Sequence, residues 1–235
     1  MKRHCAYTTN NIERITNVNT SKIILTGGLG RVGSSIFDDV LTRSNNLENY
    51  YELLQYPTET PEHFQDWHPP GGREGALQLL STIENWCLTI WIQDTYNFPH
   101  IEEFARLDPT LVINLYRENM FEQFLSWRIA EKNLMWNDVK KFNYNPIEIT
   151  QDEVDYFLRS KEKAKKIIQQ LRDKYHVIDI SYEQIISHQV PDGLNIVDWN
   201  FKLAKQTTFG EKCKLVTNFN ELKSIWSNSL LLYDI

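Results

Sequence analysis

The chain has 235 residues, of which 41% are hydrophobic and 12% aromatic, and its formal net charge is −6. The acidic balance argues against sequence-independent binding to nucleic acid as the main activity, and the aromatic content argues against intrinsic disorder. This length suits a chain with one buried core. We therefore expect a single domain over 1–235, in which 1–20 form an irregular lead-in.

The apolar runs and the cysteine spacing argue against membrane-spanning, disulfide-rich and metal-binding proteins. No apolar run approaches the roughly 18–20 residues that a membrane span requires, and 1–20 lack the apolar block of a signal peptide. Cys5, Cys87 and Cys213 are far apart, and neither they nor the six histidines have the spacing of a metal site. We expect a cytoplasmic protein with no membrane span, no disulfide scaffold and no protein-bound metal.

The predicted elements alternate between strands and helices. A buried strand at 22–26 leads into a glycine loop at 27–35, and a helix with an apolar face at 36–41 follows. Residues 55–75 are rich in Pro and Gly, which predicts an ordered loop or lid. The later elements are a helix over 76–86, strands at 88–92, 111–116 and 177–180, helices over 119–132 and 150–174, and a C-terminal helix starting near Asn218. The helix over 150–174 opens with a capping box at Thr150-Gln-Asp-Glu153. This alternation predicts an α/β fold with a central parallel sheet flanked by helices.

The glycine loop has three interpretations. Gly28, Gly30 and Gly33 form the G-x-G-x-x-G pattern of dinucleotide-binding proteins, and the segment also looks like the start of nucleotide-sugar epimerases. The same residues fit a Walker A pattern in which Ser34 stands where Lys belongs. The run Arg31-Val-Gly-Ser-Ser35 resembles the R-S-G-[ST]-[ST] loop of sulfotransferases. All three predict an anion site, because glycine backbone N–H groups and a helix N-terminus attract negative charge.

Two of these interpretations lack a required part. A dinucleotide site needs an acidic residue at the end of a second strand, and no apolar strand leads into the acids of 48–60. An epimerase also needs a Tyr-x-x-x-Lys pair, which the chain does not have. A Walker A ATPase needs the lysine that meets the β- and γ-phosphates.

The sulfotransferase resemblance extends to a second motif at 111–136, LVINLYRENMFEQFLSWRIAEKNLMW. It has a strand that ends in Arg117 and a following helix that carries Ser126, which is the ninth residue after Arg117 where the common form has the eighth. A guanidinium and a hydroxyl placed in this way can bind one phosphate together. The resemblance implies that this is the 3′-phosphate of 3′-phosphoadenosine 5′-phosphosulfate (PAPS).

Shorter matches follow in the same order as in the family. Ile180-Ser-Tyr-Glu-Gln-Ile185 resembles the segment that places a Tyr, here Tyr182, near the adenine, and Lys205-Gln206 resembles the C-terminal segment that closes over the nucleotide. The resemblance implies a P-loop NTPase-like sulfotransferase fold with PAPS as the sulfuryl donor and no metal. The 5′-phosphosulfate would be cradled by Gly30, Arg31, Val32, Gly33, Ser34 and Ser35.

The expected reaction transfers a sulfuryl group to an alcohol on a carbohydrate or small metabolite, and this needs a base and positive charge at the leaving phosphate. Arg31 and the loop N–H groups suit the leaving side. The expected base is Glu52, because its segment resembles the one in which many bacterial sulfotransferases place a glutamate. His63 and His68 are the alternatives. Trp67 is expected to touch the acceptor.

The sequence leaves alternatives for the function, and it gives no specific role to the basic stretch that follows 160. The rival functions are an NAD(P)-binding reductase or epimerase, and a nucleotide-binding protein without catalytic activity. The basic stretch 161–166 has helical spacing and is interpreted as a solvated helix face. Neither the acceptor nor the oligomeric state has a signature in the sequence.

Overall fold

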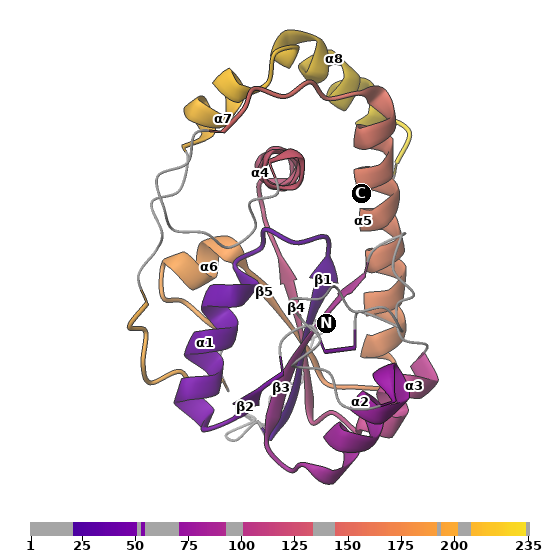
Figure 1. Ribbon diagram of the computed structural model, residues 1–235, viewed down its shortest axis with the longest axis vertical. Helices are drawn as coiled ribbons and strands as arrows, with labels where there is room; N and C mark the ends of the chain where they lie inside the picture. The colour runs from indigo at the N-terminus through magenta and orange to yellow at the C-terminus, as the bar shows by residue number, and fades with distance from the viewer. Residues whose placement is uncertain are drawn as a thin grey trace, which may run out of the picture.

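The computed structural model describes the chain over 21–50, 53–54, 71–92, 101–133, 144–191, 194–201 and 208–233. Its centre is a five-stranded sheet in which all neighbouring strands are parallel (Figure 1). The strands are β1 (Lys22–Gly28), β2 (Glu48–Asn49), β3 (Trp86–Ile92), β4 (Leu111–Tyr116) and β5 (Val177–Ser181). Their order across the sheet is β2-β3-β1-β4-β5, so β1 lies in the middle between β3 and β4.

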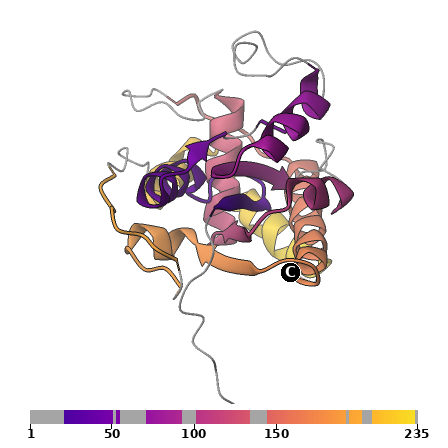
Figure 2. The same ribbon diagram turned by 90° about the horizontal axis from the view of Figure 1, so that it is seen from below.

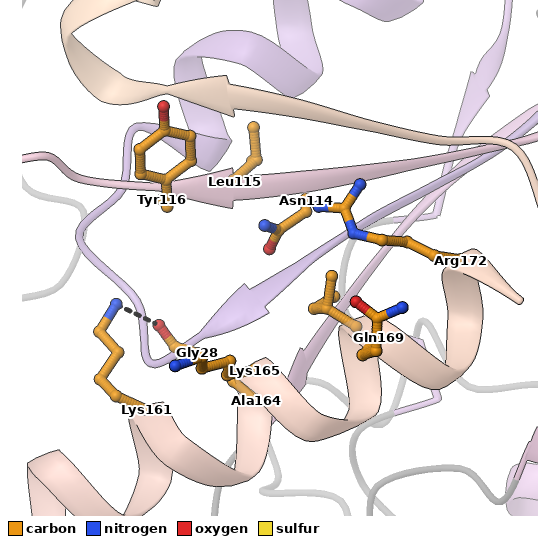
Figure 3. Close-up of a pocket in the computed structure, with 10 residues that line it drawn as sticks. Gly28, Asn114, Leu115, Tyr116, Lys161, Ala164, Lys165, Gln169 and Arg172 are labelled. Atoms are coloured by element: carbon orange, nitrogen blue, oxygen red, sulfur yellow. Dashed lines mark hydrogen bonds between the residues drawn. The ribbon is translucent and has the colours of Figure 1, made fainter. Parts of the chain in front are cut away.

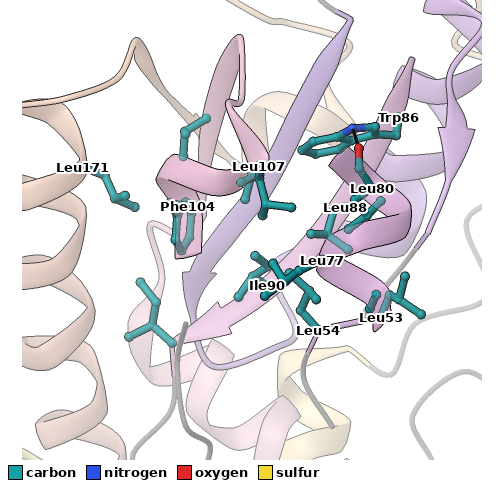
Figure 4. Packing of buried hydrophobic residues seen from close by; sticks show 14 of the residues in the cluster. Leu53, Leu54, Leu77, Leu80, Trp86, Leu88, Ile90, Phe104, Leu107 and Leu171 are labelled. Atoms are coloured by element: carbon teal, nitrogen blue, oxygen red, sulfur yellow. Dashed lines mark hydrogen bonds between the residues drawn. The ribbon is translucent and has the colours of Figure 1, made fainter. Parts of the chain in front are cut away.

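Helices cover both faces of the sheet, which explains why the strand sequences are continuous apolar runs. The helices α1 (Ser34–Asn45) and α6 (Tyr182–Ile186) lie on one face, and α2 (Gly72–Thr82), α3 (Ile101–Leu107) and α5 (Gln151–Arg172) lie on the other (Figures 1 and 2). On the second face, Trp86 is fully buried and its indole N–H donates to the carbonyl oxygen of Leu80 at 3.1 Å (Figure 4).

A third layer stands above the carboxyl ends of the strands. The helix α4 (Met120–Lys132) is buried continuously from Gln123 to Ala130, and Figure 1 shows it end-on beneath α7 (Phe209–Leu215) and α8 (Phe219–Leu230). Large aromatic side chains fill the space between α4, α5 and α8. The rings of Phe124 and Trp226, for example, have centroids 5.2 Å apart. The layer therefore holds the C-terminal helices close to the edge of the sheet where the glycine loop emerges.

The structure confirms the α/β class and the parallel sheet, and it corrects several boundaries. The strand at 111–116 has the predicted bounds, and the capping box of Thr150 and Glu153 opens α5 as expected. The helix predicted at 76–86 instead spans Gly72–Thr82, because the chain starts this helix at glycines and Trp86 already belongs to β3. The elements β2 and α3 were not predicted, since two residues at a sheet edge and a seven-residue helix carry little periodicity.

Candidate anion site at the glycine loop

The loop between β1 and α1 is built on strained backbone. Leu29 and Arg31 have φ angles of 43° and 71°, and Gly33, the residue before α1, has φ 79°. For residues with a Cβ this left-handed region is costly, and such strain is concentrated at functional sites. The α1 N-terminus that follows has neither a side-chain cap nor an acidic residue in its first turn. Its N–H groups thus present positive potential to an anion.

Gly33 joins the glycine loop to the Tyr182 segment. A Cβ atom on Gly33 would lie 2.8 Å from Cδ2 of Tyr182, which is closer than real contacts allow. Tyr182 is 7% exposed, and its ring also lies beneath the Arg117 guanidinium, whose carbon is 4.6 Å from the ring centroid. Three residues that the sequence placed in separate motifs are therefore in one cluster.

Gln123 fixes the direction of the loop peptides. Its side-chain nitrogen donates to the carbonyl oxygens of Gly28, Leu29 and Gly30 at 3.4, 3.0 and 3.0 Å. In a trans peptide the N–H points opposite to the C=O, and the chain has no cis peptide among its described residues. The N–H groups that follow these three carbonyls consequently point away from α4, in the orientation that an anion cradle needs.

Three cations converge beside the loop from three different elements. Arg117 follows β4, Lys212 lies on α7, and both pair with the same carboxylate oxygen of Glu122, at 2.9 and 2.8 Å. The third cation is Arg31, whose charge acts on Lys212. Burial lowers the pKa of Lys212 and the hydrogen bond and charge of Glu122 raise it, while the charges of Arg117 and Arg31 lower it further. Burial likewise lowers the pKa of Arg31, with a further decrease from Arg117. The cations are near enough to repel one another, and an anionic ligand would relieve that repulsion.

The carboxylates near Arg117 set its position. Burial acts to raise the pKa of Glu122, but Lys212 and Arg117 together hold it below its ordinary value. A second carboxylate, Glu183, lies 3.8 Å from Nε of Arg117 and accepts a hydrogen bond from the backbone N–H of Glu118. Arg117 is only 9% exposed, so it is a fixed group at the strand end rather than a solvated one.

Ser126 lies one turn after Gln123 on α4, and residues three apart share a helix face. It is 6% exposed, and among the described residues neither its Oγ nor the Oε1 of Gln123 finds a hydrogen-bond partner. Two buried polar atoms without partners on the helix that holds the loop are the kind of feature that a ligand or bound water satisfies.

The structure thus brings together several of the predicted site residues and leaves others undescribed. Gly30, Arg31, Val32, Gly33, Ser34 and Ser35 form the loop and the start of α1, with Arg117 and Tyr182 against it. The predicted base Glu52, the alternatives His63 and His68, the acceptor contact Trp67, and Lys205 and Gln206 lie outside the described residues.

Three residues of this region were missed by the sequence analysis. Gln123 and Lys212 carried no signal, because their proximity to the loop arises only from the packing of α4 and α7. Lys161 was placed on a solvated helix face, and this was wrong: it is half-buried, and its Nζ is 3.4 Å from the carbonyl oxygen of Gly28. The helical spacing of basic and apolar residues in 161–166 predicted the helix, but it could not show that the glycine loop packs against it.

The strand order bears on the rival dinucleotide interpretation. In the dinucleotide-binding fold, β1 lies between β2 and β4, and the acid that binds the ribose ends β2 next to it. Here β3 separates β2 from β1. Any acid at the end of β2 is therefore one strand too far from the glycine loop to play that role.

No protein-family model and no curated protein matches this chain. Among the helices within the described ranges, none is long and apolar enough to cross a membrane.

Proposed function

We propose that the protein is a sulfotransferase that moves a sulfuryl group from PAPS to a hydroxyl acceptor. The observation that carries the proposal is that two cation-bearing groups, each suited to an anion, lie close together at one edge of the sheet. One is the glycine loop with Arg31, and the other is the Arg117–Lys212 pair on Glu122. PAPS has two separate phosphate groups, which two adjacent sites would bind, whereas a site for a single phosphate needs only the loop.

In the proposed reaction the acceptor oxygen attacks sulfur and forms a new S–O bond. The S–O bond to the 5′-phosphate breaks, and adenosine 3′,5′-bisphosphate leaves with the electron pair. Arg31 and the outward N–H groups of the loop would stabilise the charge that develops on this phosphate. Glu52 would take the proton of the acceptor hydroxyl. Arg117, Ser126 and Lys212 would hold the 3′-phosphate and so position the donor.

The test compares adenosine 3′,5′-bisphosphate with 5′-AMP, NADPH and ATP by thermal unfolding of the full chain. A ligand at 100 times its Kd adds about 2.7 kcal/mol of stability, which raises Tm by several degrees in a protein of this size. We expect the bisphosphate to stabilise more than 5′-AMP, because only it occupies the second site. Stabilisation by NADPH alone would overturn the proposal.

Matched variants on α7 assign the second phosphate. In Lys212→Met, the rise in Tm with the bisphosphate should exceed the rise with 5′-AMP by less than in the wild type. Lys214 is an exposed lysine on the same helix, and Lys214→Met should behave like the wild type. Transfer of labelled sulfate from PAPS to a panel of alcohols then tests catalysis. Glu52→Gln should lose turnover and keep nucleotide binding, and a wild-type protein that binds the bisphosphate but transfers nothing would be a binding protein only.

A further inference from the structure

A pocket of about 290 Å³ lies behind the glycine loop, between the end of β4 and the middle of α5 (Figure 3). Its wall includes Gly28, Asn114, Tyr116, Lys161, Lys165 and Arg172. The volume is at the lower limit of the roughly 300–1,000 Å³ of small-molecule sites. Gly28 is the last residue of β1, so the pocket adjoins the loop on the side of α5, while the Arg117–Lys212 pair lies on the side of α4 and α7.

The residues that line this pocket carry three cations and no carboxylate. Arg172 is already neutralised, because its Nη2 is 2.6 Å from both carboxylate oxygens of Asp179. Asp179 also accepts a hydrogen bond of 2.8 Å from the amide of Asn114. At this end of the pocket, Asp179 thus compensates the charge of Arg172, whereas the opposite end holds another cation.

Lys161 is at that opposite end. Its ammonium group has the Gly28 carbonyl at 3.4 Å and lies 5.5 Å from the centroid of the Phe157 ring, and no carboxylate in the described ranges pairs with it. Burial lowers the pKa of Lys161 to about 7. A desolvated cation without a counter-ion is costly, and an anion that enters the pocket would supply the missing partner. By contrast Lys166, on the same helix, is exposed and pairs with Glu162.

We propose that this pocket is the acceptor subsite and that it selects an acceptor bearing its own anionic group, a carboxylate or sulfate on a hydroxylated compound the size of a sugar acid, which Lys161 binds. The inference rests on the proposed sulfotransferase function, since it is the loop next to Gly28 that would hold the donor. An acceptor anchored by its anion on Lys161 would lie within one residue of the loop, with its hydroxyl free to turn toward the sulfuryl group.

The experiment measures binding of D-glucuronate and 4-hydroxybenzoate to the full chain by calorimetry, with adenosine 3′,5′-bisphosphate present and absent. D-Glucose and phenol, which lack the carboxylate, are the neutral counterparts. A hydrogen bond to a charged group corresponds to about a 10- to 100-fold change in affinity, so we expect Lys161→Met to lose at least about tenfold. Lys166→Met removes the same charge from the same helix and should bind like the wild type, and Lys161→Arg should restore part of the affinity.

The outcomes separate this inference from the function on which it rests. Anion binding that depends on Lys161, together with bisphosphate binding that does not, supports both. Bisphosphate binding with no saturable binding of either anion, or with equal anion binding by Lys161→Met, overturns the acceptor subsite and leaves the function standing. Anion binding without any bisphosphate binding refutes the sulfotransferase, and with it the acceptor role of the pocket. Thermal unfolding of Lys161→Met without ligand is the control for folding: a cooperative transition shows that the variant is folded.

Discussion

At the scale of single residues, Gly33 meets two constraints that no other residue type satisfies. Its φ of 79° is left-handed, and its missing Cβ makes room for Tyr182. We predict that Gly33→Ala lowers the free energy of unfolding by about 1–3 kcal/mol, from the backbone strain and from the displaced ring. Urea denaturation measures the loss.

Gly210 on α7 is the matched control for this substitution. A Cβ there meets no atom within 4 Å, and its φ is not in the left-handed region. Gly210→Ala should be neutral or stabilising by up to about 1 kcal/mol, because alanine favours a helix. An equal loss of stability in both variants would show that the Gly33 conformation carries no special cost.

Asp38 makes stability depend on pH. It lies on the buried side of α1 and is 1% exposed, and its Oδ1 has no hydrogen-bond partner among the described residues. Burial raises the pKa of Asp38 to about 6, although hydrogen bonds from Cys87, Asn49 and Thr89 act to lower it. Because the folded state binds this proton more tightly than the unfolded chain, the contribution of Asp38 to stability is greatest below pH 4. It is lost as pH rises to about 6.

Asp38→Asn removes this titration. We subtract the free energy of unfolding of the wild type from that of the variant at each pH. This difference should be about 2 kcal/mol more positive at pH 7.5 than at pH 4.5. Urea denaturation of both proteins at the two pH values provides the comparison. If the difference between the proteins is the same at both, the carboxyl of Asp38 does not titrate in this range.

At the scale of elements, α4 acts on the loop through one amide. Gln123→Glu would place a carboxylate against three carbonyl oxygens that now accept hydrogen bonds, and the peptides should turn away from it. We expect affinity for adenosine 3′,5′-bisphosphate to fall at least about tenfold, since the cradle N–H groups lose their direction. Calorimetry gives the affinity.

A purely structural role for Gln123 would give a different pattern. Gln123→Met keeps the shape of the side chain and removes the donor without adding charge, so its loss of affinity should lie between those of the wild type and Gln123→Glu. Amide hydrogen exchange at Leu29 and Gly30 should rise in step with the loss of affinity. Unchanged exchange in the loop, with a general loss of stability, would contradict positioning by Gln123.

The elements that were predictable from sequence are those whose cause is local. The strand Leu111–Tyr116 is buried on both faces and bounded by turn residues, so its apolar run marks both ends. The α5 start was readable because the capping box is a four-residue signal. The α2 start was not, because glycines are poor helix formers and only tertiary packing places a helix there.

The site was predictable in its motifs and not in its assembly. Arg31 and Arg117 stand out in the sequence because glycines and a strand end adjoin them. Lys212 does not, because it reaches Arg117 only through Glu122, and these residues come from α7, the end of β4 and α4. Lys161 likewise faces the loop across 133 positions of sequence, a separation that no local pattern encodes.

At the scale of the whole molecule, the order β2-β3-β1-β4-β5 places β1, the first of the described strands along the chain, in the centre of the sheet. Both neighbours of β1 come later: β3 ends at Ile92 and β4 at Tyr116. On the ribosome, the apolar segment Lys22–Gly28 therefore has no partner until β3 has been synthesised to Ile92, and its second edge stays unpaired until β4 has been synthesised to Tyr116. Non-local parallel pairing forms slowly and exposes strand edges meanwhile. The nascent chain thus passes through a stage in which the strand that ends at the centre of the sheet still has unpaired, aggregation-prone edges, and it is this stage that a chaperone would have to protect.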